Sequence, residues 1–331
     1  MKTLYVGDPH CTVDELKDCD NLMFGVSQIA SDEQVDQICI LGDLHHNHSI
    51  VRLEVFSFWN KVFKNLVALH PNTKIVVIVG NHDMAGNQAV SASTCNAVQM
   101  YGDVGIDVVD SPTVIDNVLH LPYYREPSEF IEVCKTYDSY KNLVCHQSFN
   151  GSNYENGSFI PDGVDPDVIP QTSVISGHIH TKQDYGKVRY IGSPRWRIAT
   201  DANVDKVVSV VTRDETGTII NTLDFATDVY CRAMFRLTDT QDNPLNLDEL
   251  ITDKHSYVID VEGDSNWVDS RIALYPTGVK KRAIRTNTRI PTIRESEGIE
   301  VAFKKYLGSY KPQNNTTQDR LAELAKDRLC L

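Results

Sequence analysis

The sequence predicts an α/β protein of the α+β sandwich type, in which two mixed β-sheets are flanked by helices. In the amino-terminal third, short apolar segments alternate with amphipathic segments of helical length, which is the pattern of parallel strands joined by helices. From residue 104 onward, short alternating segments follow one another closely, which favours antiparallel strands. The 331 residues are enough for one large core and a smaller module.

Composition and charge exclude several classes of protein. The apolar and charged fractions, 41% and 23%, are those of an ordinary globular protein, and no apolar segment is long enough to span a membrane. The amino terminus lacks the apolar region of a signal peptide, so we expect a cytoplasmic protein, in the host cytoplasm if a phage encodes it. The formal net charge of −13 argues against binding of nucleic acid by overall electrostatics, although two divalent cations would reverse the field locally.

The cysteines point to a reducing environment. All eight lie outside CxxC pairs and mostly within apolar segments, so we expect reduced thiols in the core instead of disulfides. Cys11, which follows His10, is either a soft metal ligand or a packing residue. Isolated thiols more often pack, and we favour that interpretation.

Five expected strands end at polar residues that bind metals well. Residues 38–41 are apolar throughout, which indicates a parallel strand covered on both faces, and they lead into Gly42-Asp43. Glycine allows a tight turn there, so we expect the Asp43 carboxylate at the carboxyl end of the strand, where open α/β sheets bind ligands. The other four strands lead into Asp8 and His10, into Asn81-His82-Asp83, into His146, and into His178 and His180.

Helices are expected within residues 14–30 and 51–69 and near residues 87–100. Phe56 and Val67 widen the apolar stripe of the helix at 51–69, which suggests either a homodimer contact or plain core packing; we favour core packing. The later strands are expected at residues 104–109, 114–121, 142–145, 172–175, 188–191, 207–211 and 218–223.

The character of the sequence changes near residue 227, and we expect three parts: residues 1–226, a small αβ cap module at 227–290, and an arm of two amphipathic helices at 291–331. Strands are expected in the cap at 229–237, 257–261 and 272–275. Between residues 271 and 294 every charged residue is basic, which indicates either a solvated face or a contact surface in an otherwise acidic chain.

The polar residues at the strand ends indicate a metal centre. Six of the eleven histidines lie there with Asp8, Asp43 and Asn81. Imidazole, carboxylate and amide ligands together suit manganese, iron or zinc, whereas magnesium and calcium prefer oxygen alone. A carboxylate shared by two ligand groups can bridge two cations about 3.5–4 Å apart, a spacing that stabilises the attacking and leaving oxygens of a phosphoryl displacement. Satisfied core histidines are the alternative, but each group left unpaired would cost roughly 1–3 kcal/mol.

In their order along the chain, these motifs resemble those of the calcineurin-like metallophosphoesterase superfamily. The matching residues, which lie within residues 1–225, are Asp8-x-His10, Gly42-Asp43, Gly80-Asn81-His82-Asp83, His146 and Gly177-His178-x-His180. Serine/threonine protein phosphatases carry an arginine soon after the second motif aspartate, where this chain has Leu44-His45-His46. The Gly-Asp-Leu-x-His form and the segment Tyr190-Ile191-Gly192-Ser193-Pro194 are instead similar to the SbcD (Mre-eleven) type of DNA repair and recombination nucleases, which include phage recombination endonuclease subunits.

The resemblance implies roles for the motif residues. One metal would be held by Asp8, His10, Asp43 and His180 and a second by Asp43, Asn81, His146 and His178, with Mn²⁺ as the expected ion. A bridging hydroxide would attack phosphorus while His82 assists the leaving group, His46 helps to position the phosphate and Asp83 orients His82. His45 and His48 match no role, and Arg125, Arg195 and Arg197 are candidates for phosphate contacts.

The implied activity is that of a manganese-dependent DNA phosphodiesterase, a 3′ to 5′ exonuclease and single-strand endonuclease. It would be the nuclease subunit of an SbcCD-like complex, with an SbcC-type (Rad-fifty-like) ATPase bound to residues 291–331. Two other classes stay open. A stand-alone phosphoesterase acting on nucleotides or small phosphodiesters would not need the arm, and a metal-binding scaffold without turnover would not need His46 and His82.

Overall fold

The computed structural model describes residues 1–86, 91–250, 255–276 and 278–286. The chain divides into two compact units, one of Met1–Arg236 with Ile251–Val258, the other of Leu237–Leu250 with the residues from Ile259 onward. This division lies within two strands, whereas the sequence predicts a boundary at residue 227. The arm expected at 291–331 lies outside the described residues.

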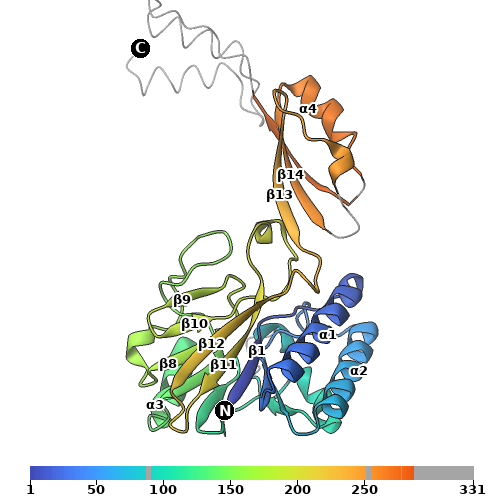
Figure 1. Ribbon diagram of the computed structural model, residues 1–331. Coiled ribbons are helices and arrows are strands. Elements are labelled where there is room, and N and C mark those ends of the chain that lie inside the picture. Colours follow the sequence, from blue (N-terminus) through green and yellow to red (C-terminus); the bar gives the residue numbers. More distant parts are fainter. Residues whose placement is uncertain (87–90, 251–254, 277, 287–331) are drawn as a thin grey trace, which may run out of the picture. The chain divides into compact units, whose positions relative to one another are not determined.

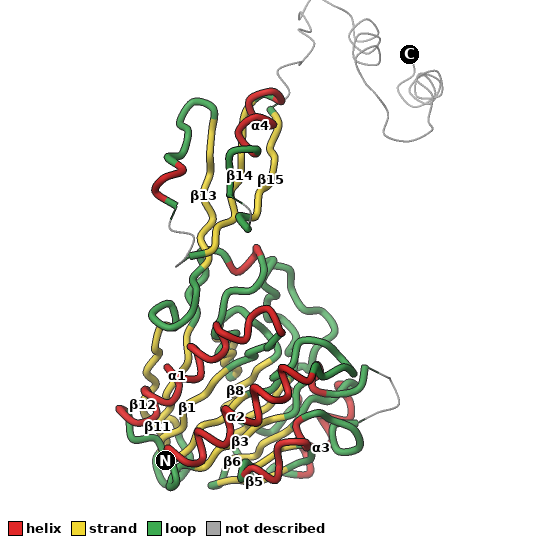
Figure 2. Tube along the Cα trace, turned by 90° about the vertical axis from the view of Figure 1, so that its right-hand side faces the viewer, coloured by secondary structure: helices red, strands yellow, loops and turns green. Residues whose placement is uncertain are grey.

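The first sheet of the large unit has six strands in the order β12-β11-β1-β2-β3-β4. Figures 1 and 2 show β12, β11 and β1 side by side. The helices α1 (Leu16–Asp32) and α2 (Leu53–Leu69) connect its first three strands and pack on one face. Because β1, β2 and β3 are parallel, their carboxyl ends meet at one edge. The parallel strands are β1 (Lys2–Val6), β2 (Gln37–Ile40), β3 (Lys74–Ile78) and β4 (Asp107–Val109), and the antiparallel ones are β11 (Val207–Arg213) and β12 (Ile219–Ala226).

The second sheet also has six strands, in the order β5-β6-β7-β8-β10-β9. The helix α3 (Pro127–Thr136) packs on it through Phe130 and Cys134. The expected fold class, two mixed sheets flanked by helices, is therefore confirmed. Its parallel strands are β6 (Val118–Leu121), β7 (Asn142–His146), β8 (Ser173–Gly177) and β10 (Val188–Tyr190), with β5 (Thr113–Ile115) and β9 (Gln183–Tyr185) antiparallel at the edges.

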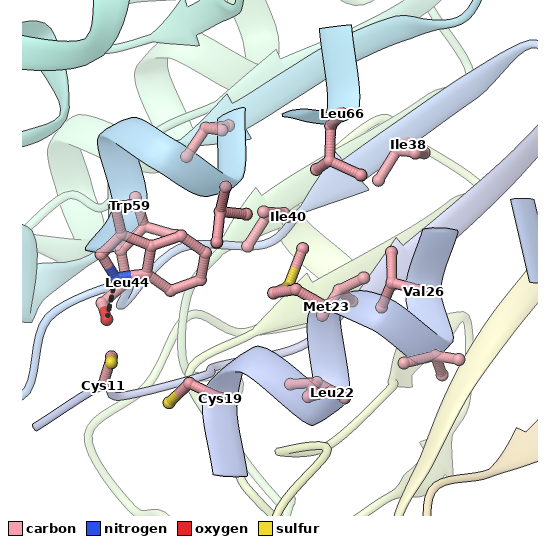
Figure 3. Packing of buried hydrophobic residues seen from close by; sticks show 14 of the residues in the cluster. Cys11, Cys19, Leu22, Met23, Val26, Ile38, Ile40, Leu44, Trp59 and Leu66 are labelled. Carbon is pink, nitrogen blue, oxygen red and sulfur yellow. Dashed lines mark hydrogen bonds between the residues drawn. The ribbon is translucent and has the colours of Figure 1, made fainter. Parts of the chain in front are cut away.

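Alternating side chains of the strands build separate cores on the two faces of each sheet. Between the sheets, Tyr5 and Cys39 of the first pack with Val144 and Ile175 of the second. On the helix side of the first sheet, Ile38 and Ile40 lie against α1 and α2 (Figure 3). There the Trp59 indole donates a hydrogen bond to the carbonyl of Leu44 at 3.3 Å, which ties α2 to the chain beyond β2. The two sheets are thus held face to face with their strand ends aligned.

Glycines let the strand ends approach their neighbours closely. A Cβ at Gly7 would lie 1.8 Å from the carbonyl oxygen of Gly192, and one at Gly80 would lie 2.5 Å from the backbone nitrogen of Asp43. A side chain at either position would push the segments apart. Glycine at the strand ends therefore serves close packing as well as the turn at Gly42, whose φ is +106°.

Two expectations for the middle of the chain are wrong. The strands β4, β6, β7, β8 and β10 are parallel, whereas β11 and β12 are antiparallel as expected. Buried polar residues such as His120 and Ser176 imitate the alternation of a half-exposed strand. The segment 114–121 holds two strands, since Asp116 and Asn117 adopt φ values of 50° and 63° and turn the chain into a hairpin.

The helix expected near residues 87–100 is also wrong for its described part. Residues 92–94 form a turn and Asn96 forms an isolated β-bridge with Met84. The Thr94 hydroxyl accepts a hydrogen bond from the Ser91 nitrogen and donates one to the Ser91 carbonyl. Such side-chain bonds compete with helix formation. A 3-10 helix then forms at Val98–Val104, and residues 87–90 lie outside the described residues.

A three-stranded sheet follows β12, in the order β13 (Met234–Thr240), β14 (Ser256–Gly263) and β15 (Lys280–Arg285). The strand expected at 272–275 is wrong: Asp264 accepts a hydrogen bond from the Trp267 nitrogen at 2.9 Å and caps α4 (Ser265–Ile272). The basic stretch contributes β15, where Arg282 and Arg285 pair with Asp260 and Asp269. These pairs neutralise part of its charge.

Core packing accounts for the wide apolar stripe of α2. The ring of Phe56 stacks on Tyr101 with 5.4 Å between centroids, and Val67 packs on the same core. The homodimer contact stays a prediction. Within the described ranges, every helix is too short or too polar to cross a lipid bilayer.

Gly7→Ala is expected to lower the free energy of unfolding by about 1–3 kcal/mol, because the new Cβ meets a backbone carbonyl. Gly102→Ala is the matched control, since a Cβ there has no described atom within 4 Å, and its stability should change by less than about 1 kcal/mol. Urea unfolding followed by circular dichroism measures both variants. Equal stability of the two would contradict the close approach of β1 to Gly192.

Candidate metal centre

The carboxyl ends of five strands, three from the first sheet and two from the second, bring the predicted site residues together. The carboxylates Asp8 and Asp43 and the imidazoles of His10 and His146 are at most 1% exposed. The two sheets thus enclose one buried polar centre. In chain order its residues are Asp8 and His10 after β1, Asp43 after β2, Asn81 and His82 after β3, His146 at the end of β7, and His178 and His180 after β8.

One group of ligand atoms belongs to Asp8, His10 and His180, whose atoms lie within 4.8 Å of one another. The Nε2 atoms of His10 and His180 face each other at 2.8 Å. Asp8 Oδ1 accepts a hydrogen bond from the His178 nitrogen at 2.8 Å, but Oδ2 is buried and receives none from any described residue. A cation would satisfy this orphaned oxygen and both facing nitrogens.

A second group belongs to Asp43, His146 and His178, again within 4.8 Å. Asn81 joins it, since its Oδ1 lies 2.9 Å from His146 Nε2 and 2.8 Å from His178 Nδ1. The Nδ1 of His146 lies 2.7 Å from the carbonyl of Leu41, a pairing that assigns the ring proton to Nδ1. His146 Nε2 is therefore left as an electron-pair donor for a cation.

Asp43 lies between the two groups. Its Oδ2 is 3.4 Å from Nε2 of His10 and 3.4 Å from Nε2 of His146. Its Oδ1 accepts a hydrogen bond from the His82 nitrogen at 2.8 Å, which fixes the carboxylate. One carboxylate oxygen is thus shared by two sets of ligand atoms, as a ligand that bridges two cations requires.

The backbone is strained at three residues of the centre. His10, Asp43 and His178 have φ values of 46°, 52° and 79°, a left-handed region that costs non-glycine residues on the order of 1–3 kcal/mol each. The loops after β1 and β2 support each other here, because the His10 nitrogen donates to the carbonyl of Asp43 at 2.8 Å. Backbone strain at a buried cluster of polar side chains is typical of a functional site.

The electrostatics of the centre favour cation binding. Burial lowers the pKa of His10 well below its usual value and lowers the pKa of His178 to about 3, so both rings are neutral at pH 7, the form that binds metals. Burial alone would raise the pKa of Asp43, but the imidazole of His146 holds it well below its usual range. Burial alone would lower the pKa of His146, but the Asp43 carboxylate raises it to about 9, so a cation at His146 Nε2 would displace a proton. Burial raises the pKa of Asp8, and a nearby cation would keep that carboxylate ionised. Two nitrogen and oxygen donor sets of this kind fit two divalent ions.

His46 and His82 lie on the more exposed side of the centre. Their rings are stacked with 5.7 Å between centroids, and ligand atoms of both lie within 4.8 Å of one on His10. His82 Nδ1 is 2.5 Å from the carbonyl of His46. The Nε2 atom of His82 therefore points away from that carbonyl. His48, which matches no role in the sequence, stacks on His82 with 3.9 Å between centroids.

The prediction that Asp83 orients His82 is wrong. The Asp83 carboxylate accepts hydrogen bonds from the His45 ring at 2.8 Å and from the Gly80 nitrogen at 3.1 Å. His45 is 2% exposed, and its other ring nitrogen pairs with the hydroxyl of Tyr101 at 3.0 Å. The Asp83 carboxylate therefore faces the loop after β2 and not the His82 ring. The pair of Asp83 and His45 joins the loops after β2 and β3.

Arg195 is wrong as a candidate for a phosphate contact. It is 1% exposed and donates to the carbonyl of Pro9 at 2.6 Å, while it pairs with Asp18 at 3.1 Å and Glu15 at 3.3 Å. Arg197 also pairs with Glu15, at 3.1 Å. Arg195 therefore holds the loop that carries Asp8 and His10 and is closed off from substrate.

Sequence reasoning missed two residues that contact His180. Glu155 Oε1 lies 2.8 Å from His180 Nδ1, and Lys206, which is 3% exposed, donates to the His180 carbonyl at 3.2 Å. Glu155 lies in a polar connection that carries no motif, and Lys206 immediately precedes a strand on the other sheet. A local pattern in the sequence could not have indicated either contact.

Comparison with known proteins identifies similar chains. Residues 1–182 match the calcineurin-like phosphoesterase family. "Putative phosphoesterase 078R" of Invertebrate iridescent virus 3 is 29% identical over 192 residues, which are 55% of this chain and 54% of that protein. "Exonuclease subunit 1" of Enterobacteria phage T4 is 30% identical over 175 residues, 49% of this chain and 48% of that protein. The chain thus matches about half the length of these two relatives.

Among solved structures, the protein TT1561 of Thermus thermophilus is similar with a TM-score of 0.41 and 12% identity, over 67% of this chain and 98% of that chain. The family match spans more than half of the sequence and includes all five strand ends of the centre, from Asp8 to His180. This chain therefore belongs to the calcineurin-like phosphoesterase family.

Proposed function

We propose that this chain hydrolyses phosphodiester bonds of DNA with two divalent cations, Mn²⁺ being the expected ion. It would act as a 3′ to 5′ exonuclease and single-strand endonuclease, the SbcD-type subunit of a repair or recombination complex. The observation that carries the proposal is the position of Asp43 Oδ2, 3.4 Å from an imidazole nitrogen of each ligand group. The name of the phage T4 relative, an exonuclease subunit, supports both the substrate and the complex.

The two ligand groups would each hold one ion. When bound, two such ions lower the pKa of a water molecule and stabilise the charge that develops during phosphoryl transfer. The chain itself keeps the ligands in place, for example through the bond from His146 to the Leu41 carbonyl and the bond from the His178 nitrogen to Asp8. The proposed sets are Asp8, His10, Asp43 and His180 for one ion and Asp43, Asn81, His146 and His178 for the other.

His82 and His46 would act on the phosphate. Both are only partly buried, and they lie beside His10 on the side of the centre that a substrate can reach. The bond between His82 Nδ1 and the His46 carbonyl leaves His82 Nε2 for the leaving oxygen, which it would protonate or stabilise. Asp83 takes a supporting part in this scheme, since it holds the loop on which His46 lies.

A stand-alone phosphoesterase for nucleotides or small phosphodiesters is the second candidate, favoured by the relative from Invertebrate iridescent virus 3, which is named as a phosphoesterase. The two candidates share the centre and differ in substrate. A scaffold without turnover is disfavoured, because the ligand groups alone would be enough for it and His46 and His82 would have no use.

The proposal predicts that the purified chain degrades end-labelled DNA in the presence of Mn²⁺ and that a chelator stops the reaction. Asp43→Asn should abolish cleavage, since it weakens both proposed ion sites at once. Gel analysis of linear duplex and single-stranded DNA measures the activity, with bis(p-nitrophenyl) phosphate as a parallel substrate. Hydrolysis of the small phosphodiester with intact DNA would reject the nuclease and favour the stand-alone phosphoesterase.

His82→Ala is expected to reduce kcat about 10²- to 10⁴-fold while Mn²⁺ and DNA still bind, because the ring assists the leaving group and is not among the proposed ligands. His70→Ala is the control, since the His70 ring pairs with Ser27 between α1 and α2. Single-turnover cleavage of a labelled oligonucleotide measures the chemical step. Unchanged turnover of His82→Ala would remove this residue from the mechanism.

The proposed partner is an SbcC-type ATPase that binds the arm at 291–331. Deletion of residues 295–331 is expected to spare hydrolysis of bis(p-nitrophenyl) phosphate, because every proposed ligand lies before residue 181. The same deletion should abolish binding to an SbcC-type ATPase. A pull-down with the shortened and the complete chain measures the contact, and equal recovery of the ATPase would show that it binds elsewhere.

A further inference from the structure

The connection between β7 and β8 reaches back to the metal centre through Glu155. Its Oε1 lies 2.8 Å from Nδ1 of His180, and the two side chains are 19% and 24% exposed. On the other side of the same ring, Nε2 of His180 faces Nε2 of His10 at 2.8 Å. The imidazole thus lies between a carboxylate and the Asp8, His10 and His180 group.

This arrangement differs from that of the other described histidines of the centre. The Nδ1 atom of His146 lies 2.7 Å from the carbonyl of Leu41, and that of His10 lies 3.3 Å from the carbonyl of His45. Those carbonyls are neutral, although His146 Nδ1 also lies 3.3 Å from Oδ1 of Asp8, itself a proposed ligand. Glu155 is a carboxylate from outside the proposed ligand sets. A carboxylate at one imidazole nitrogen fixes the tautomer and increases electron donation from the other nitrogen to a metal.

Glu155 is held in place by the rest of its connection. Gln183 of β9 forms two hydrogen bonds with the backbone of Asn153, one donated by the Asn153 nitrogen at 2.9 Å and one donated to its carbonyl at 2.8 Å. The Tyr154 nitrogen donates to the carbonyl of Ser158 at 2.9 Å, which closes the turn around residue 155. These contacts hold Glu155 beside the His180 ring, and the bond from Lys206 to the His180 carbonyl holds the His180 backbone.

We propose that Glu155 is a positioning residue for the cation bound by Asp8, His10 and His180: it holds His180 Nδ1–H so that Nε2 is aimed at the ion. The inference rests on the proposed function, in which His180 is a ligand. It makes the affinity of one of the two ion sites depend on a connection that lies outside the family motifs. The other site, with His146 and His178, would be independent of Glu155.

The test is a Mn²⁺ titration of the metal-free chain by calorimetry. Glu155→Ala is expected to weaken one of two binding events about 10- to 100-fold and to leave the other unchanged. Glu155→Gln keeps an acceptor without the charge, so a smaller loss is expected. Asp162→Asn is the matched control, because it removes one negative charge from an exposed position of the same connection, and its titration should equal that of the unmodified chain.

Kinetics separate positioning from loss of structure. In Glu155→Ala, the Mn²⁺ concentration that gives half-maximal hydrolysis of bis(p-nitrophenyl) phosphate should rise, while kcat recovers at saturating Mn²⁺. Unchanged affinity of both sites, or a kcat that saturating Mn²⁺ does not restore, would overturn the role of Glu155. If the unmodified chain binds no Mn²⁺, the proposed function fails, and the inference fails with it.

Discussion

The structure depends on the close approach of strand ends from two stacked sheets. Asp43 follows a strand of the first sheet, yet its Oδ2 lies equally near His10 of the same sheet and His146 of the second. This geometry requires that the apolar layer between the sheets, which contains Tyr5 and Val144, keep them face to face. It also requires that no side chain stand at Gly80, where a Cβ would overlap the Asp43 backbone.

The centre was predictable from sequence because its residues follow a simple physical rule. Parallel strands present their carboxyl ends at one edge, so polar residues placed directly after apolar segments converge without any knowledge of the intervening chain. Asp8 and Asp43 are brought together in this way within the first sheet, whereas His146 joins them because the second sheet stacks on the first. Strand direction was harder to predict, because β6 and β8 bury His120 and Ser176 and therefore resemble half-exposed antiparallel strands in sequence.

The residues that support the side chains of the centre were not predictable. Asp83 stands next to His82 in the sequence, but its carboxylate binds His45 of another loop. Arg195 looked like a surface cation and is instead buried under the loop of Asp8. Glu155 reaches His180 from the connection between β7 and β8. In each case the partner is set by the packing of distant segments, which local pattern and spacing do not encode.

The central claim is that two cations share the Asp43 carboxylate. The most direct measurement is the anomalous scattering of manganese in crystals soaked with Mn²⁺. We expect two peaks, one among Asp8, His10 and His180 and one among Asn81, His146 and His178, both within coordination distance of Asp43. A single peak, or two peaks of which neither contacts Asp43, would contradict this claim.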